Sequence, residues 1–492
     1  MRYSGFIIFA SQIFSLVTGL FFTLLLTRNM TNAQFGVWSL IFYIIGLFAI
    51  FNGLFPFWVT RFAARGIPGS IKTGISANVI VGLIAALIYL PLVIPIMNAL
   101  NIGNEYVLVY ALASIQIFNT MLIAACESSL QAIKPQVKGY GLIIEEITKV
   151  ALAFVLIVVL KQLFLGAMIS LIAGASVQAL FYTWLLKGEL RESINWNALK
   201  QWLKGSTAII YNGVGNYLSS LILFFLVSYA SGQTGTTALG DYQAAVTFSV
   251  VIGYASVLAF ALYPKMLAVE CPQDVSTAFK TTIMLSLPMA AAALTMPRSL
   301  LVILKSTYAP ASPILPLLAV NALIVLISQF YTQCLMGSET FDIEGKISLK
   351  ELVKSKIFKV FTLPYIQAAI ALPAAYIVLT RFVPADPVQA ASAVVAISIA
   401  VNSIAFAGLY IFMRKSVCLP VAWKSIGKYV LGALVMGALL LAIPQTSTLT
   451  LTLLKLLIGL AAYTAVLYVI DADARSLFSD VWTEIKDTLR PK

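Results

Sequence analysis

The sequence contains no histidine and only four cysteines among its 492 residues. Histidine is the commonest general base and a frequent metal ligand, so its absence argues against a histidine-dependent catalytic or metal centre. Cys126, Cys271, Cys334 and Cys418 are widely spaced and form no CxxC pair, which predicts neither a disulfide framework nor a metal site. We therefore expect a protein without a metal ion or a cofactor.

Charged residues are also scarce, at 10% of the chain against 60% hydrophobic residues, and the mean hydropathy is +0.95. A soluble domain carries about 25% charged residues, so this chain has too few to cover a water-facing surface. Its apolar residues fall in runs of about twenty, the length with which a helix crosses the ~30 Å hydrocarbon core of a bilayer. Long runs with short breaks indicate helices rather than the alternating strands of a barrel.

The sequence thus predicts an all-α polytopic membrane protein with about 14 transmembrane helices. The predicted spans lie near residues 5–27, 35–58, 74–98, 106–126, 140–160, 163–186, 206–231, 241–262, 280–298, 313–335, 360–380, 389–412, 426–443 and 449–470. Arg2 precedes the first span, but no small-residue cleavage site follows it, so we interpret that span as retained rather than as a signal peptide.

Lysines and arginines fall mostly on one side of these spans. With the N-terminus placed on side one, that side carries 25 of the 32 basic residues. The positive-inside rule then puts both termini in the cytoplasm, and we expect a multi-pass protein of the plasma membrane. This topology accounts for most of the net charge of +13, and no clustered basic face with stacking aromatics indicates a nucleic-acid partner.

The chain shows signs of an internal duplication with a shift of 204 residues. Under that shift Gly36, at the start of the second span, falls on Gly240 at the start of the eighth, and Arg61 falls on Lys265. Six spans per half that enter from the same side make a parallel repeat about a pseudo-two-fold axis normal to the membrane. The predicted domains are an N-terminal lobe (1–190), a C-terminal lobe (191–415), and two further helices with a cytoplasmic tail (416–492).

Three segments resemble polysaccharide-export flippases of the MOP (multidrug/oligosaccharidyl-lipid/polysaccharide) superfamily. LLLTRNMTNAQFGVWSL has an arginine, a short loop, and then a glycine and an aromatic residue at the next span. ALGDYQAAVTFS, with LYPKMLA downstream, is the second segment, and LVILKSTYAPASPILPLL, with a Tyr-Ala-x-Ala-x-x-x-Leu pattern, is the third. The resemblance extends over spans one to twelve. It implies two six-helix lobes around a central cavity, alternating access, and a polyprenyl- or dolichyl-phosphate-linked glycan as cargo.

Arg28 ends the first predicted span, near the outer interface. A cation there can pair bidentately with a phosphate, or its stem can cover apolar surface while its head reaches water. The resemblance, in which the first lobe presents an arginine towards the cavity, adds weight to the phosphate role. We also expect Arg61, Arg65 and Lys265, at the cytoplasmic ends of spans two and eight, to draw a diphosphate into the cavity.

No aspartate or glutamate occurs before Glu105, so the first three spans contain no acid. The cation-coupled drug extruders of the MATE branch resemble the same fold but use an acid in the first lobe to hold Na⁺ or H⁺. An intramembrane carboxylate is costly and is kept for such a task. Its absence favours an anionic cargo, and a cation-coupled drug or metabolite antiporter is the alternative.

Glu145, Glu146 and Lys149 share one side of the fifth span, at i,i+4 and i,i+3 spacing. They predict either a self-neutralising cluster at the interface or an H⁺ or Na⁺ coupling site, since two acids and one base leave a titratable charge. Asp241 begins the eighth span, where the helix dipole favours an acid, and we expect it to cap that helix. Lys455, in the outer third of the last span, is expected to snorkel to the interface.

Uncharged polar residues gather in spans one, four, six and seven. Glycans are bound through amides and aromatic faces, so these residues are candidates to line a sugar-binding cavity. The alternative is hydrogen bonding between helices, worth ~0.6 kcal/mol each on average. The candidates are Gln12, Ser15, Thr18, Gln116, Asn119, Gln178, Tyr182, Tyr211, Asn212, Asn216 and Tyr217.

Two cytoplasmic segments have amphipathic patterns, namely INWNALKQWLKG before the seventh span and the lysine-rich stretch 337–359. Apolar residues on one face and lysines on the other are typical of a segment that lies on an anionic membrane leaflet. We predict membrane lipids as the partners of both.

An enzyme is the competing class. Polytopic glycosyltransferases need a carboxylate in an early outer loop, and the loop after the first span has none. Glycan polymerases usually carry a large outer loop, and every outer loop predicted here is short. No nucleophile–base pair or Gly-rich phosphate loop appears, so a polytopic glycan-modifying enzyme is the second alternative. We predict a monomeric flippase, not an enzyme, that moves a polyprenyl- or dolichyl-(di)phosphate-linked oligosaccharide from the cytoplasmic to the outer leaflet, with H⁺ or Na⁺ as candidate coupling ions.

Overall fold

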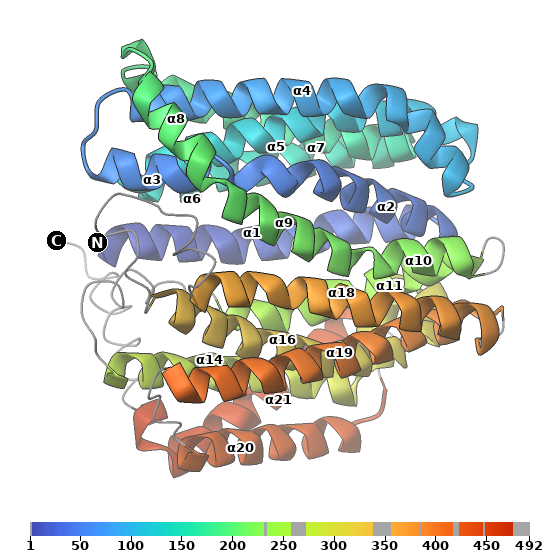
Figure 1. The fold of residues 1–492 in the computed structure, drawn as a ribbon. Coiled ribbons are helices and arrows are strands. Elements are labelled where there is room, and N and C mark those ends of the chain that lie inside the picture. Colours follow the sequence, from blue (N-terminus) through green and yellow to red (C-terminus); the bar gives the residue numbers. More distant parts are fainter. Residues whose placement is uncertain are drawn as a thin grey trace. The chain divides into compact units, whose positions relative to one another are not determined.

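The computed structural model describes residues 2–230, 234–256, 272–337, 356–383, 385–416, 423–445 and 448–475. Within these ranges the secondary structure is entirely helical, without a strand, which confirms the predicted all-α fold (Figure 1). The chain divides into two compact units. The first comprises Met1–Gln243 and Thr340–Val394, and the second comprises Ala244–Glu339 and Val395–Lys492. Most of the lysine-rich stretch 337–359 lies outside the described residues.

The first unit is a bundle of long helices in which α1 packs on α6, α6 on α7, α5 on both α4 and α7, and α9 on α18. Its elements are α1 (Arg2–Asn29), α2 (Asn32–Phe48), η1 (Ala49–Gly53), α3 (Pro56–Ala64), α4 (Ser70–Ala99), η2 (Asn104–Tyr106), α5 (Val107–Ile133), α6 (Gln136–Ala153), the π-helical turn η3 (Phe154–Val159), α7 (Leu163–Leu185), η4 (Glu189–Arg191), α8 (Trp196–Gly205), α9 (Thr207–Ser220), α10 (Ile222–Tyr229) and α18 (Lys356–Arg381), together with the first parts of α11 (Thr234–Gly253) and α19 (Pro387–Ser416).

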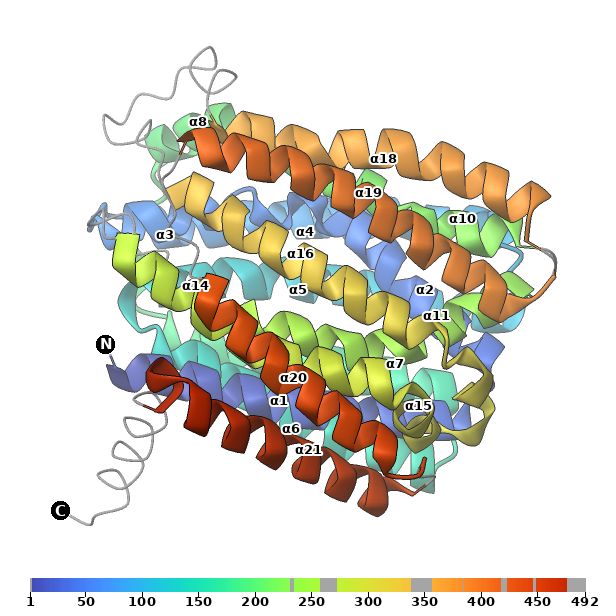
Figure 2. The ribbon, with the colours of Figure 1, turned by 90° about the horizontal axis from the view of Figure 1, so that it is seen from below.

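The second unit contains the remaining parts of α11 and α19 and packs α14 against α16 and α20. Its other elements are η5 (Tyr254–Ser256), α14 (Pro272–Thr295), α15 (Pro297–Leu304), η6 (Ser306–Ala311), α16 (Ile314–Gly337), α20 (Trp423–Ala442) and α21 (Leu449–Ile470). Figure 2 shows α20 and α21 as neighbouring antiparallel helices beside α14.

Among the described residues, 11 helices are long and apolar enough to cross a membrane, or up to 12 if the bent pair α2 and α3 forms one span. Two further predicted spans are helical but more polar. One is α6, which carries Glu145, Glu146 and Lys149, and the other is α11, which carries Asp241. The described helices thus match the positions of the fourteen predicted segments, of which 11 or 12 are long and apolar enough to span a membrane, and the chain is a multi-pass membrane protein.

The second predicted span, at 35–58, is not one straight helix. α2 ends at Phe48, a 3₁₀ turn follows, and α3 begins at Pro56 with a bend of 45° between the two parts. A proline has no N–H to continue a helix and clashes with the preceding turn, but it fits the first position of a new one. Gly53, three residues earlier, has the lowest helix propensity of any residue except proline. The hydropathy of the segment does not show this break, although its proline does.

Lys455 does not snorkel as expected. It is buried, at 2% exposure, and its Nζ donates to the carbonyl oxygens of Ile443 at 2.8 Å and Pro444 at 3.4 Å. The carbonyls at a helix C-terminus lack partners within the helix, and a cation satisfies them and the helix dipole. Lys455 on α21 therefore closes the end of α20 and joins the two helices.

Candidate functional site

The most highly charged buried feature of the first unit lies between α1 and α6. Glu146 and Lys149 are 4% and 8% exposed, and the Lys149 Nζ lies 2.7 Å from the Glu146 Oε1. Two hydroxyls from α1 also hydrogen-bond the Glu146 carboxylate. Ser15 Oγ donates to Oε1 at 2.8 Å, and Thr18 Oγ1 donates to Oε2 at 2.7 Å. The Glu146 carboxylate thus has a cation and two hydroxyl donors within hydrogen-bond distance.

Among the described residues Lys149 forms its ion pair with Glu146. Glu145 is half-buried and lies on the face of α6 that packs on α7, as Lys149 does. Gly174 lets α7 approach α6 closely, because a Cβ at this position would lie 2.9 Å from the Glu145 carbonyl oxygen and 3.2 Å from the Lys149 Cβ. Glu145 therefore lies beside the Glu146–Lys149 ion pair and interacts electrostatically with both of its members.

The crossing of α2 and α11 brings together residues that the predicted shift of 204 makes equivalent. A side chain at Gly36 would collide with the Thr236 carbonyl, and a side chain at Gly240 would collide with the Asn32 carbonyl. Gly36 and Gly240 are 204 residues apart, and so are Asn32 and Thr236. The contact is thus symmetric under the predicted shift, as expected where a pseudo-two-fold axis passes between two equivalent helices.

Asp241 was expected to cap its helix, and this prediction is wrong. α11 begins at Thr234, so Asp241 lies in its second turn, where it is 4% exposed. Its Oδ1 accepts a hydrogen bond of 2.6 Å from the Asn32 Nδ2 at the start of α2. Further along both helices, Tyr43 OH donates to Gln243 Oε1 at 3.1 Å. Two polar contacts between α2 and α11 therefore accompany the glycine crossing.

The polar residues of the seventh predicted span lie on α9. Asn216 is exposed and its Nδ2 donates to both the backbone carbonyl and the Oδ1 of Asn212, at 3.0 and 3.1 Å. Tyr217 is half-buried, 6.4 Å from Phe224 between ring centroids. Tyr211 instead serves packing, because its ring stacks on Tyr365 at 4.4 Å and its backbone carbonyl accepts from the Tyr365 hydroxyl. Asn212 and Asn216 thus form an accessible pair of amides.

Asn119 and Gln178 are buried and used between or within helices in this conformation. Asn119 on α5 donates to Ser176 Oγ at 2.9 Å and to the Ile172 carbonyl at 3.3 Å, both on α7. Gln178 Nε2 lies 3.1 Å from the Tyr182 hydroxyl, which itself donates to the Lys138 carbonyl at 3.0 Å. These contacts match the alternative of interhelical bonding, and the sugar-binding role stays a prediction.

The remaining predicted residues lie at different places. Arg28 is exposed in the last turn of α1, Gln12 is half-buried on α1, and Arg65 is exposed after α3. Arg61 on α3 lies over the Phe57 ring at 4.4 Å from its centroid. Lys265 is outside the described residues.

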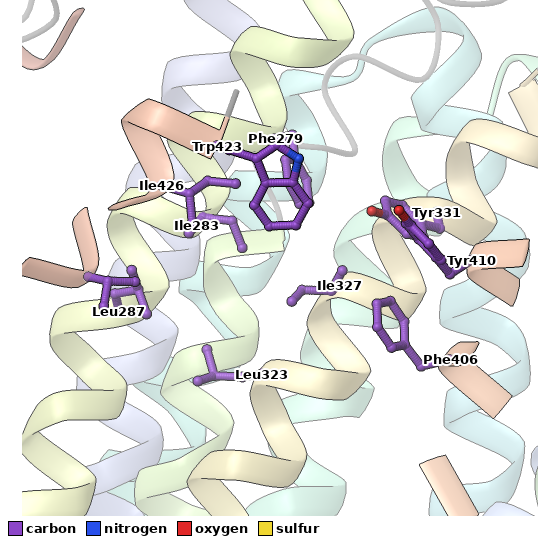
Figure 3. Close-up of a pocket in the computed structure, with 11 residues that line it drawn as sticks. Phe279, Ile283, Leu287, Leu323, Ile327, Tyr331, Phe406, Tyr410, Trp423 and Ile426 are labelled. Atoms are coloured by element: carbon purple, nitrogen blue, oxygen red, sulfur yellow. The ribbon is translucent and has the colours of Figure 1, made fainter. Parts of the chain in front are cut away.

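The second unit contains an apolar cavity of about 330 Å³. Figure 3 shows its walls, with Phe279 and Trp423 on one side and Tyr331, Phe406 and Tyr410 on another. Stacked rings join the walls, since Tyr331 lies 6.0 Å from Phe279 and 6.2 Å from Tyr410. The cavity is lined by Phe279, Ile283, Leu287, Leu323, Ile327, Tyr331, Phe406, Tyr410, Trp423, Ile426 and Val430. Such a surface suits a hydrocarbon chain.

Two features of the structure leave no recognisable signal in the sequence. Asn32 has no charge and sits in a short loop motif, so nothing marks it as the partner of Asp241, 209 positions away. The cavity is built from apolar residues on α14, α16, α19 and α20, which are indistinguishable by pattern from residues that face lipid. Only the count of aromatic residues near the ends of those spans could have hinted at it.

No protein-family model and no curated protein sequence matches the chain. Solved structures do. A structure titled lipid II flippase MurJ, in an inward closed conformation, has a TM-score of 0.69 at 14% identity and covers 95% of this chain and 99% of its own. An inward-facing multidrug resistance MATE transporter of the MOP superfamily has a TM-score of 0.61 at 13% identity and covers 82% and 96%. An outward-facing MATE structure has a TM-score of 0.55 at 12% identity, covering 84% and 94%.

The chain therefore has the fold shared by MATE transporters of the MOP superfamily and the lipid II flippase. This confirms the expected likeness to that superfamily at the level of the fold.

Proposed function

We propose that this protein is a flippase that moves a polyprenyl- or dolichyl-(di)phosphate-linked oligosaccharide from the cytoplasmic to the outer leaflet by alternating access. The observation that carries the proposal is the extent of the likeness to the lipid II flippase. It covers 95% of this chain, whereas the MATE structures named above cover 82% and 84%. The likeness to a flippase of a lipid thus extends over nearly the whole chain.

Three features of the chain support a cargo with an anionic head, a sugar and a hydrocarbon tail. The helices α1 to α4 contain no acidic residue, and an acidic residue there would repel a phosphate. The amides of Asn212 and Asn216 offer donors and acceptors to sugar hydroxyls without charge. The apolar cavity of the second unit offers a dry surface of the kind that a prenyl tail requires.

The crossing of α2 and α11 supports alternating access. Two helices that touch backbone to backbone at Gly36 and Gly240 can separate without unpacking large side chains. The hydrogen bond from Asn32 to Asp241 is then the specific contact that opening must break. We assign this crossing as a gate of the transport cycle.

The experiment that tests the function uses purified protein in liposomes that contain a fluorescent polyprenyl-diphosphate saccharide, with the outer-leaflet label destroyed by a membrane-impermeant reagent. Flipping makes the inner-leaflet pool accessible. We expect wild type to flip the lipid, and Arg28→Ala to slow it at least tenfold, because the loss of a charge-assisted phosphate contact removes about 1.5–3 kcal/mol. Arg28→Lys should retain part of the rate.

An absence of flipping by wild type in both leaflet directions would contradict the proposed function. Normal transport by Arg28→Ala with failure of Arg28→Lys would instead remove only the phosphate role of Arg28. The two results are therefore separable.

A second candidate, a cation-coupled antiporter, is favoured by one observation, the buried Glu146–Lys149 pair with the adjacent Glu145. A carboxylate kept within the membrane is a device for H⁺ or Na⁺ coupling. Uptake of a cationic dye driven by a pH or Na⁺ gradient in the same liposomes, abolished by Glu146→Gln, would support the antiporter.

A further inference from the structure

α8 has one buried side and one exposed side, and the exposed side carries both apolar and basic residues. Ala198 and Trp202 are buried against the first unit, at 3% and 0% exposure. Trp196 and Leu203, seven positions apart, form an apolar stripe that is 64% and 55% exposed. Lys200 lies four positions after Trp196, Lys204 lies four positions after Lys200, and both lysines are exposed. A helix in an aqueous loop would bury one apolar side against the protein and carry polar residues elsewhere. The exposed Trp196 and Leu203 therefore indicate that this part of α8 contacts an apolar environment rather than water.

The anchoring of α8 places it at the membrane boundary. The Asn195 side chain accepts from the Ala198 N–H at 3.0 Å, and the Asn195 N–H donates to Thr73 Oγ1 at 2.7 Å in the first turn of α4. A helix of 30 residues, as α4 is, spans about 45 Å, which exceeds the ~30 Å hydrocarbon core. The first turn of α4 therefore lies at headgroup level, and Figure 1 shows α8 crossing the unit at that end.

The charge of the helix is of one sign. The sequence WNALKQWLKG contains two lysines and no acid. Among the residues that the structure describes, no acidic side chain forms an ion pair with Lys200 or Lys204. Glu192, the nearest acid in the sequence, has its Oε2 engaged by the backbone N–H of Gly69. The exposed cationic face is thus available for a ligand of negative charge.

We propose that α8 is a binding site for anionic phospholipid, with the lipid phosphates on Lys200 and Lys204 and with Trp196 and Leu203 in the upper acyl region. Tryptophan prefers this depth because its ring is apolar and its N–H is polar. The site does not depend on the proposed flippase activity, since the bound lipid is a bilayer component rather than the cargo.

The binding also acts on the start of α9. Ser206 joins the two helices, and its Oγ accepts from the Trp58 Nε1 at 3.1 Å and donates to the Trp202 carbonyl at 2.7 Å. Ser206 is therefore the connection through which a lipid that holds α8 also holds the first turn of α9, the helix that carries Asn212 and Asn216. Anionic lipid should order this connection.

The test uses the full-length protein in two kinds of nanodisc, one of phosphatidylcholine alone and one in which about 30% of the lipid is phosphatidylglycerol, to imitate an anionic leaflet. Hydrogen exchange is followed in peptides that cover α8, and native mass spectrometry in detergent measures the preference for retained phosphatidylglycerol. Wild type should show slower exchange in α8 with the anionic lipid. The Lys200→Gln/Lys204→Gln variant should lose this slowing and about tenfold or more of the preference, since each lysine near a surface contributes about fivefold.

Two controls make the result specific. Lys134→Gln/Lys161→Gln removes the same charge at exposed positions outside α8 and should behave as wild type. Lys200→Arg/Lys204→Arg keeps the charge and should retain the lipid effect. Equal loss in the Lys134/Lys161 control, or unchanged preference in the Lys200/Lys204 variant, would overturn the site. Protection of α8 that is independent of lipid charge and depends on protein concentration would replace it with contact to a second protein chain.

Discussion

The ion pair of Glu146 and Lys149 is the residue-scale feature with the largest energetic consequence. Both groups are at least nine-tenths buried, so removal of one partner leaves an uncompensated charge in a low dielectric. We expect Lys149→Met to destabilise the protein by about 3–5 kcal/mol, measured by denaturant or thermal unfolding in detergent. The Glu146→Gln/Lys149→Met double variant should recover most of this loss, because no buried charge then remains.

A matched control is available in the same unit. Lys138 and Glu127 form a pair of 3.3 Å, and both side chains are 30% exposed. Solvent screens such a pair, so Lys138→Met should cost about 0–1 kcal/mol. Similar losses from Lys149→Met and Lys138→Met would contradict the argument from burial.

The sequence predicted part of this cluster for a physical reason. Glu146 and Lys149 are three positions apart on one helix, so their proximity follows from helix geometry alone. Ser15 and Thr18 are 131 and 128 positions from Glu146, and only the packing of α1 on α6 brings them together. Local pairs could therefore be predicted, and the partners across helices could not.

At the scale of elements, the crossing of α2 and α11 depends on the absence of a side chain. We expect Gly36→Ala to destabilise the protein by about 1–3 kcal/mol, because its methyl group would occupy the place of the Thr236 carbonyl and force the helices apart. Gly46→Ala on the same helix is the control, since no atom lies within 4 Å of its Cβ position. That change should be neutral or stabilise by up to about 1 kcal/mol through helix propensity.

The free energy of unfolding of both variants is measured in the same detergent. We expect it to fall for Gly36→Ala and to stay the same or rise for Gly46→Ala. A Gly36→Ala protein as stable as Gly46→Ala would show that the helices separate at no cost, and the crossing would then not serve as a closed gate.

Hydropathy predicted the existence of the helices well but not their breaks or their pairing. The spans follow from apolar runs, whereas the bend before Pro56 and the second-turn position of Asp241 depend on where each helix begins. The shift of 204 residues matched Gly36 with Gly240, but nothing in the sequence indicates that the two positions touch. Their contact depends on how α2 packs on α11.

At the scale of the whole molecule, the transport proposal requires a place for the hydrocarbon tail of the cargo, and the cavity of the second unit is the described space that suits it. No periodic pattern in the sequence marks this cavity. Its lining comes from four helices whose apolar residues look alike whether they face lipid, a neighbouring helix or a cavity. The fold could thus be predicted from the sequence, but the cavity could not.

Ile327 lies in the middle of this lining, between Leu323 and Tyr331 on α16 (Figure 3). We expect Ile327→Trp to fill the cavity and to slow flipping of a long-chain polyprenyl-linked saccharide severalfold, while a short-chain analogue, which needs less of the cavity, is slowed less. Leu434→Trp on α20 is the control, because Leu434 is 65% exposed and does not line the cavity. Equal slowing of long and short chains by Ile327→Trp would indicate a general disturbance of the second unit. Equal rates for wild type, Ile327→Trp and Leu434→Trp would mean that the tail travels outside the cavity, in contact with lipid alone.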